Sequence, residues 1–201
     1  MPSKIKIIKA KPSDAFALSV LTRKYFDYAQ LNHEKILKRL NSPNYEYWVA
    51  RDAASGALAG FIDIDFAPVR GLRKNDAFEK DSAAVTEQKE ASGVAYTTKA
   101  RRAMEREGTR AANHRSPRSK QAKILGLAVL PEFRGRGIAR RLIAKAEARA
   151  KARGCRNVFL LVREDNALAR ALYEKLGFSL RGTLAEKLWG KTILLYSKEL
   201  E

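Results

Sequence analysis

The sequence is poor in the residue types that build disulfides and metal sites. Its 201 residues include one cysteine and two histidines. The single cysteine, Cys155, excludes a disulfide within the chain, and we expect it to be a small buried residue rather than a nucleophile. His33 and His114 lie far apart and show no metal-ligand spacing, so we expect no metal site.

Long hydrophobic runs are also missing. No apolar segment approaches the roughly 18–20 residues that a helix needs to cross a bilayer, and the N-terminus has no apolar, signal-like stretch. We therefore expect a cytoplasmic protein without a membrane partner. Hydrophobic residues nevertheless make up 45% of the chain, which is typical of a folded globule rather than a disordered polymer. The sequence leaves a monomer and a homodimer equally open.

Acidic residues are scarce relative to basic ones. The chain has 22 Asp and Glu against 40 Lys and Arg, a formal net charge of +18. A surface of this charge attracts polyanions, such as RNA, the ribosome or a multiply phosphorylated cofactor. Many proteins are basic for reasons of solubility alone, so the charge does not choose among these functions.

Hydrophobic periodicity predicts one α/β domain over residues 1–201. The segments ILGLAV at 124–129 and NVFLLV at 157–162 are apolar on both faces, as expected of central strands. A helix that follows residue 137 carries Ile138, Leu142, Ala146 and Ala150 on one inner stripe. The other predicted elements are strands at 4–10, 45–50, 58–67, 179–185 and 192–198, and helices at 14–25, 32–40 and 166–178.

Residues 70–123 depart from this alternation. They hold 14 basic and 7 acidic residues and few large apolar ones, too few to build a core. We therefore expect a basic, mobile insertion between two strands, at about 70–123. Its most basic part, Lys99–Lys123, could contact RNA, the ribosome or an acidic partner, or it could be a solvated basic loop.

The stretch RGRGIARR, at Arg134–Arg141, follows a predicted strand and opens a predicted helix. The first turn of a helix has free backbone N–H groups and a partial positive charge, and glycines let an anion approach the backbone. The GxxxxGK[ST] spacing of a Walker A loop is absent. The Rossmann pattern GxGxxG is also absent, because position 140 is Arg. The stretch therefore predicts a phosphate-binding turn of another kind.

A second motif follows at a fixed distance. AVLPEFRGRGIARRL (128–142) reads V-x-P-x-x-R-G-x-G-x-A, and NALARALYEKLGF (166–178) reads N-x-x-A-x-x-x-Y-x-x-x-G-F. This pair resembles the GNAT superfamily of acyl-CoA-dependent N-acyltransferases, and within it the RimI-like protein N-terminal acetyltransferases. The resemblance covers residues 124–200, extends to 1–67 by element order only, and is absent from the insertion. It implies an α/β GNAT fold, with a mixed, mostly antiparallel sheet of about six to seven strands flanked by helices.

The resemblance also implies acetyl-CoA as co-substrate, no metal, and roles for particular residues. Asn166 would contact the pantetheine arm, and Tyr173 would act as general acid toward the departing thiolate. These two residues are seven apart and so share one helix face. Leu168, Leu172 and Leu176 form a separate apolar stripe, so we expect that packing does not require Tyr173. The other implied cofactor-binding residues are Leu127, Ala128 and Val129 for the pantetheine arm, and Arg134, Gly135, Arg136, Gly137, Ile138 and Ala139 for the pyrophosphate.

The general base is where this chain departs from the family pattern. Leu161 and Lys123 stand where relatives place a glutamate. Candidate substitutes are Asp63, Asp65 and Glu186, although for each of them we favour an ordinary solvated carboxylate. Trp189 stands where the family forms the lip of the acceptor site, or it caps the edge of the core.

The function expected from these observations is transfer of acetyl from acetyl-CoA directly to a primary amine. An α-amine with a pKa near 8 is roughly 10% free base at pH 7, far more than a lysine, so an enzyme without an evident base favours it slightly. The acceptor could therefore be a protein N-terminus, as in the ribosomal protein type. The alternative is a CoA-binding protein of the same fold whose basic insertion binds RNA or the ribosome, with little or no catalysis.

Overall fold

The computed structural model describes residues 4–26, 31–66, 120–184, 187 and 190–201. Most of the predicted insertion lies outside the described residues, and so do His114, Glu186 and Trp189. The fold and the site below are built from the described ranges alone.

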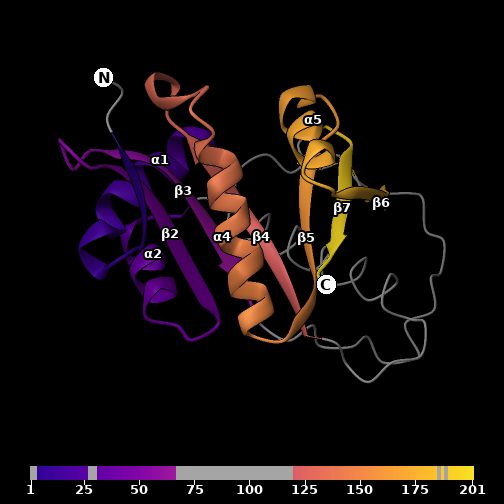
Figure 1. Cartoon of the computed structure of the whole chain (residues 1–201), viewed down its shortest axis with the longest axis horizontal. Helices are drawn as coiled ribbons and strands as arrows, with labels where there is room; N and C mark the ends of the chain where they lie inside the picture. The colour runs from indigo at the N-terminus through magenta and orange to yellow at the C-terminus, as the bar shows by residue number, and fades with distance from the viewer. Residues whose placement is uncertain (1–3, 27–30, 67–119, 185–186, 188–189) are drawn as a thin grey trace, which may run out of the picture.

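The described strands form one sheet in the order β1-β2-β3-β4-β5-β7-β6 (Figure 1). Only β4 and β5 pair in parallel; the other neighbours are antiparallel. This confirms the prediction of a mixed, mostly antiparallel sheet of six to seven strands. The strands are β1 (Ile5–Lys9), β2 (Tyr45–Asp52), β3 (Leu58–Asp65), β4 (Lys120–Val129), β5 (Cys155–Arg163), β6 (Ser179–Thr183) and β7 (Ile193–Glu199).

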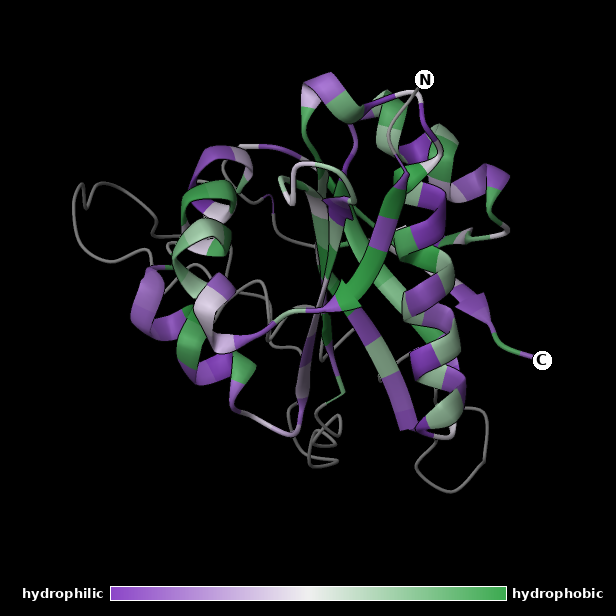
Figure 2. Ribbon diagram, turned by 60° about the vertical axis from the view of Figure 1, so that its left-hand side comes forward, coloured by the Kyte–Doolittle hydropathy of each residue, from purple (hydrophilic) through white to green (hydrophobic). Residues whose placement is uncertain are grey.

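Helices cover both faces of the sheet (Figure 2), and buried apolar residues of helices and strands form a core cluster on each face. On one face, α4 (Ile138–Ala152) and α5 (Ala167–Lys175) pack over strand residues such as Ile62 and Leu160. On the other, α1 (Ala15–Tyr25) and α2 (His33–Leu40) pack over Tyr47 and Phe61. The predicted inner stripe of α4 is confirmed, since all four of its members are buried. Short 3-10 turns, Pro12–Asp14 and Pro131–Phe133, precede α1 and α4.

Strand β4 begins at Lys120, which corrects the predicted start at Ile124 and the predicted end of the insertion at 123. Its first residues are polar, so the hydropathy pattern did not identify them as part of a strand. Lys123 is only 1% exposed, and its Nζ lies 3.8 Å from Oδ2 of Asp65 on β3 and over the ring of Phe159 on β5. A buried lysine is tolerated when an opposite charge accompanies it.

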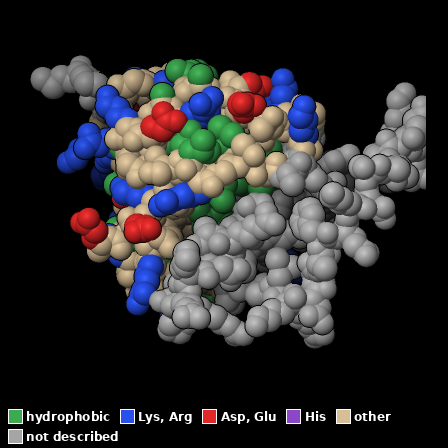
Figure 3. Space-filling model, turned by 90° about the vertical axis from the view of Figure 1, so that its right-hand side faces the viewer, with side chains coloured by type: hydrophobic (Ala, Val, Ile, Leu, Met, Phe, Trp, Pro, Cys, Tyr) green, Lys and Arg blue, Asp and Glu red, His purple; other side chains and the backbone are tan. Residues whose placement is uncertain are grey.

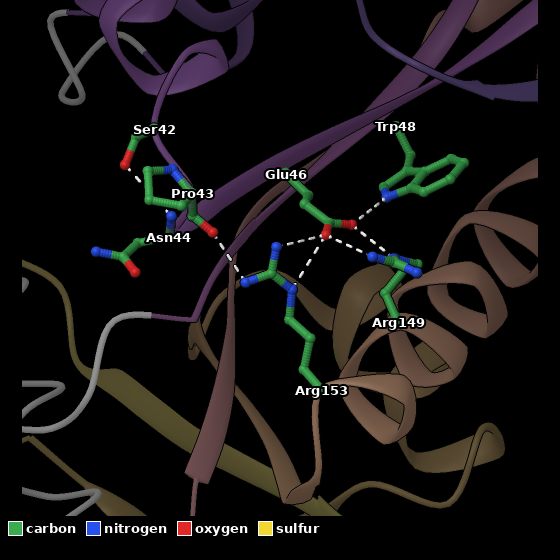
Figure 4. A network of polar contacts seen from close by, with 7 residues as sticks. All are labelled: Ser42, Pro43, Asn44, Glu46, Trp48, Arg149 and Arg153. Carbon is green, nitrogen blue, oxygen red and sulfur yellow. Dashed lines mark hydrogen bonds and ion pairs between the residues drawn. The ribbon is translucent and has the colours of Figure 1, made fainter.

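A buried carboxylate ties α4 to the sheet (Figure 4). Glu46 on β2 is 1% exposed, and its two oxygens accept hydrogen bonds from Arg149 and Arg153 at 2.8 Å and from Nε1 of Trp48 at 3.0 Å. Burial alone would raise the pKa of Glu46, but these donors outweigh it and lower the pKa to about 2. The network fixes the C-terminal part of α4, and therefore the direction in which its N-terminus points.

Candidate functional site

Strands β4 and β5 separate part of the way along their length. Their parallel pairing runs from Lys120 opposite Cys155 to Ile124 opposite Leu160 and ends there. At the same level the β3–β4 register shifts, because Asp63 lies opposite Gly126 and Ile64 opposite Ile124. Such a bulge bends a strand and increases its local twist. Beyond it, the β5-facing edge of β4 makes no ladder hydrogen bonds with β5, although both strands are described.

A cavity of about 440 Å³ lies at this separation. Both splayed strands, helix α5 with its N-cap and the end of α1 contribute to its wall. A backbone edge beside a partly apolar cavity can accept an extended ligand as an added strand. The lining residues are Tyr25, Phe26, Ile124, Leu125, Gly126, Leu127, Leu160, Leu161, Val162, Arg163, Asp165, Asn166, Ala169 and Tyr173.

The glycine turn stands between β4 and α4. Gly135 and Gly137 have φ values of 74° and 69°, a left-handed conformation that favours glycine. The amide of Arg141 donates to the Gly137 carbonyl at 3.1 Å, so the amides of residues 138–140 belong to the free first turn of α4. The side chains of the two arginines in the turn stabilise it. Arg134 donates a hydrogen bond to the Val129 carbonyl at 3.2 Å, and Arg136 donates one to the Glu132 carbonyl at 3.3 Å.

Helix α5 brings Asn166 and Tyr173 to the same cavity. The side chain of Asn166 caps the helix by accepting from the amide of Ala169 at 3.1 Å. Tyr173 is 8% exposed, and this burial raises its pKa to about 12. The phenol therefore keeps its proton at neutral pH, as a general acid must.

The expectation that packing does not need Tyr173 is wrong. Tyr173 belongs to the main hydrophobic core, with its ring centroid 5.9 Å from that of Phe178, whereas Leu168 of the predicted stripe is 87% exposed. Leu172 and Leu176 are only partly buried against that core. Tyr173 thus both packs and lines the cavity.

The carboxylates near the site differ in their surroundings. Asp65 is paired with Lys123, whereas Asp63 is 4% exposed and receives a hydrogen bond from Arg39 on α2 at 3.4 Å. Burial raises the pKa of Asp63 to about 6, although the charge of Arg39 opposes the shift. Leu161, where the resemblance to the family implies a glutamate, is part of the cavity wall.

The wall residues that the sequence did not single out as site residues include Tyr25, Phe26 and Gly126. Tyr25 shows helical spacing and reads as an ordinary core residue, and Phe26 and Gly126 carry no local signal. Among the predicted cofactor-binding residues, Leu127 and Asn166 line the cavity. Ala128 and Val129 continue β4 toward the turn that holds Arg134–Ala139.

The described ranges lack two further kinds of site. They contain no group of three or more His, Cys, Asp or Glu side chains that could hold a metal ion. No helix in them is both long and apolar enough to span a membrane.

On the edge of the molecule that carries α5, β6 and β7, hydrophobic side chains gather in the middle, with charged side chains around them (Figure 3).

The sequence profile of the acetyltransferase (GNAT) family matches residues 15–178. This chain belongs to that family. The matched range runs from the start of α1 to Phe178, just before β6, and so includes the separated strands, the glycine turn and the cavity-lining residues Asn166, Ala169 and Tyr173.

Relatives and solved structures agree with the family. A protein named acetyltransferase from Pectobacterium atrosepticum is 52% identical over 52 residues, which are 26% of this chain and 37% of that protein. One from Yersinia enterocolitica is 45% identical over 58 residues, which are 29% of this chain and 41% of that protein. These matches span less than half of each relative's length.

Two solved structures share the fold at low sequence identity. Arabidopsis thaliana NAA60 in complex with acetyl-CoA is 20% identical with a TM-score of 0.68, and the alignment covers 98% of this chain and 99% of that one. The ribosomal-protein-S18-alanine N-acetyltransferase from Escherichia coli is 14% identical with a TM-score of 0.62, over 98% of this chain and 95% of that one.

Proposed function

We propose that the protein transfers an acetyl group from acetyl-CoA directly to a primary amine, with both substrates bound at once. The observation that carries this proposal is the cavity at the separation of β4 and β5, with Asn166 and Tyr173 on its wall and the glycine turn at the end of β4. Family membership supports the same chemistry.

The chain's residues fit each part of acetyl-CoA. The free edge of Leu127–Val129 offers backbone groups to the amides of the pantetheine arm, as a neighbouring strand would. The first-turn amides of α4, after Gly135 and Gly137, suit the pyrophosphate, and an added Cβ at either glycine would meet nothing within 4 Å. That open space beside the turn leaves room for phosphate oxygens.

The reacting end of the ligand requires two kinds of group. A β4 amide beside the cavity donates a hydrogen bond to the thioester oxygen and stabilises the negative charge that develops there. The hydroxyl of Tyr173, protonated because its pKa is about 12, donates its proton to the thiolate as the C–S bond breaks.

The proposed acceptor is an amine of low pKa, such as a protein N-terminal α-amine. Such an amine loses its proton more readily than a lysine near pH 7. Support comes from the fold shared with a protein named as an S18-alanine N-acetyltransferase.

The test is a mass-shift assay with acetyl-CoA against peptides with free N-termini, lysine peptides with blocked N-termini, and polyamines. We expect a gain of one acetyl group on the α-amine peptides, faster than on the lysine peptides. Tight CoA binding without turnover on any amine would overturn the enzymatic proposal and favour a CoA-binding protein that acts on RNA or the ribosome. RNA binding by the full chain can be measured in the same preparation. Binding that weakens as salt rises would support the RNA- or ribosome-binding alternative.

A further inference from the structure

The carboxylate of Asp63 lies beside the cavity, and the role assigned to it here rests on the proposed acetyl transfer. Asp63 extends from β3 toward β4, where its neighbour is Gly126. A Cβ at residue 126 would lie 2.6 Å from Oδ1 of Asp63 and 3.5 Å from the ring of Phe26, so the carboxylate occupies the space of the missing side chain. Gly126 and Phe26 both line the cavity, which places Oδ1 directly behind its wall.

The two oxygens of Asp63 have different surroundings. Oδ2 accepts the hydrogen bond from Arg39, whereas Oδ1 is buried and has no hydrogen-bond partner within the described residues. The hydroxyl of Tyr25, also on the cavity wall, is likewise buried without such a partner. Buried polar atoms of this kind are uncommon and are costly unless a ligand or water satisfies them.

The charged and titratable groups around Asp63 come from every neighbouring element. Arg39 on α2 and Tyr47 on β2 hydrogen-bond to each other beside it, and the Tyr47 hydroxyl also donates to the Asp63 carboxylate and lowers its pKa. Asp65 on β3 raises the pKa of Asp63 through its charge, and Lys123 on β4 is paired with Asp65. The positive charges nearby are therefore already committed. Oδ1 of Asp63, which has no hydrogen-bond partner among the described residues, is the carboxylate oxygen that lies against the cavity wall at Gly126 and Phe26.

We propose that Oδ1 of Asp63, assisted by the Tyr25 hydroxyl, binds the ammonium group of the acceptor amine and removes its proton before the attack on the thioester. Asp63 thereby supplies the base that Leu161 and Lys123 do not. The substrate class is a cationic primary amine whose first carbon fits against Phe26 and Gly126.

The proposed steps balance in atoms and charge. One proton passes from the ammonium nitrogen to Asp63, and the neutral amine forms the N–C bond to the acetyl carbonyl carbon. The C–S bond then breaks, and the thiolate takes the proton of Tyr173. The second nitrogen proton returns to the phenolate of Tyr173, and Asp63 releases its own proton to solvent.

The first experiment compares wild type with Asp63→Asn by kcat at saturating acetyl-CoA and one acceptor peptide from pH 5 to 9. We expect the wild type to show an acid limb with an apparent pKa near 6, which is the pKa that burial gives Asp63. Asp63→Asn should lose that limb and at least 100-fold in kcat at pH 8, in line with the usual contribution of a general base. An Asp63→Asn enzyme within twofold of wild type, with the limb intact, would overturn the inference.

The matched control is Asp65→Asn, two residues along the same strand. It removes a carboxylate that is paired with Lys123, so the melting temperature should fall. The acid limb should persist and move to lower pH, because the charge of Asp65 raises the pKa of Asp63. Circular dichroism gives the folded fraction of each variant. Loss of activity in Asp63→Asn only in proportion to unfolding would assign Asp63 a structural role and overturn the inference.

A second variant tests the same role if Asp63→Asn does not fold. Gly126→Ala keeps Asp63 but drives its Oδ1 out of the space beside β4, so we expect the same loss of kcat with little change in the affinity for CoA. Gly182→Ala, where an added Cβ meets nothing within 4 Å, should retain full activity. Equal activity of both glycine variants would contradict the inference, whereas absence of turnover in the wild type would instead refute the proposed function.

Discussion

At the scale of single residues, Tyr173 shows how one side chain serves both the core and the site. Its ring is buried against Phe178, and this burial raises the pKa of the phenol to about 12. The same burial that makes it a packing residue therefore keeps it protonated across the physiological range. Packing and acid catalysis are compatible here because only the hydroxyl needs to reach the cavity.

Tyr173→Phe tests this dual role, since it removes the hydroxyl and keeps the ring. We expect kcat to fall by about 100-fold, as is usual for loss of a general acid, while the melting temperature changes little. The matched control is Tyr196→Phe: Tyr196 is a buried tyrosine on β7 whose hydroxyl donates to Glu174 at 2.6 Å and is not part of the cavity wall. Steady-state kinetics that drop equally in both variants would contradict the assignment.

At the scale of elements, the site depends on how β4 ends. The strand first loses its partner β5 at Ile124, then passes through the turn that contains Gly135 and Gly137 into α4. Each step exposes backbone N–H groups, first along a strand edge and then at a helix N-terminus. The two arginines of the turn hold it in shape through hydrogen bonds to the Val129 and Glu132 carbonyls.

Gly137→Ala probes the turn. An alanine at φ 69° costs about 1 kcal/mol in backbone strain, and its Cβ enters the open space proposed for phosphate. We expect the Kd for CoA, measured by calorimetry, to rise about tenfold. Gly154→Ala carries the same strain, with φ 71° and an equally open Cβ position, but at the other end of α4. An equal loss of CoA affinity in both variants would show that strain, rather than the turn, is responsible.

At the scale of the whole molecule, the network around Glu46 joins the two halves of the fold. It connects β2, from the N-terminal half, to α4, from the C-terminal half, through Arg149 and Arg153. Both arginines are near the C-terminal end of α4, where positive charge also interacts favourably with the helix dipole. The position of the glycine turn relative to the sheet therefore depends on a contact far from the cavity.

Glu46→Gln should lower the free energy of unfolding by about 3 kcal/mol, the usual cost of removing one partner of a buried ion pair. For a chain of this size that corresponds to about 6–12 °C in melting temperature. The control is Glu147→Gln, also in α4, which removes a more exposed ion pair with Lys198 and should cost at most about 1 kcal/mol. Urea unfolding of both variants makes the comparison, and equal losses would contradict a special role for Glu46.

The pH dependence of stability follows from the same carboxylate. The pKa of Glu46 is lowered to about 2 in the folded protein, so its contribution is complete above the ordinary value of 4.5 and is lost as pH falls toward 2. Urea midpoints of wild type should therefore fall steeply between pH 4.5 and 2. Those of Glu46→Gln should fall less over that range, and parallel curves would contradict the expectation.

Local sequence patterns predicted the parts of the site formed by consecutive residues. The turn at Arg134–Ala139 and the pair Asn166 and Tyr173 depend on spacing within one loop or one helix, which the sequence displays directly. The start of β4 could not be predicted in this way, because Lys123 is tolerated inside only through Asp65 on another strand. The exposure of Leu168 was missed because helical spacing does not say which stripe meets the sheet.

The sequence by itself determined the order of strands and helices along the chain, because hydropathy period and glycine placement act over a few neighbouring residues. Its two motifs, at their spacing, carried the resemblance to the family. Only the tertiary structure decided that β4 separates from β5, and that Tyr25 from α1 and Asp63 from β3 lie beside that separation. The physical reason is that strand register and helix packing bring together residues far apart in the chain. The electrostatic character of Asp63 likewise depends on burial, which no local pattern specifies.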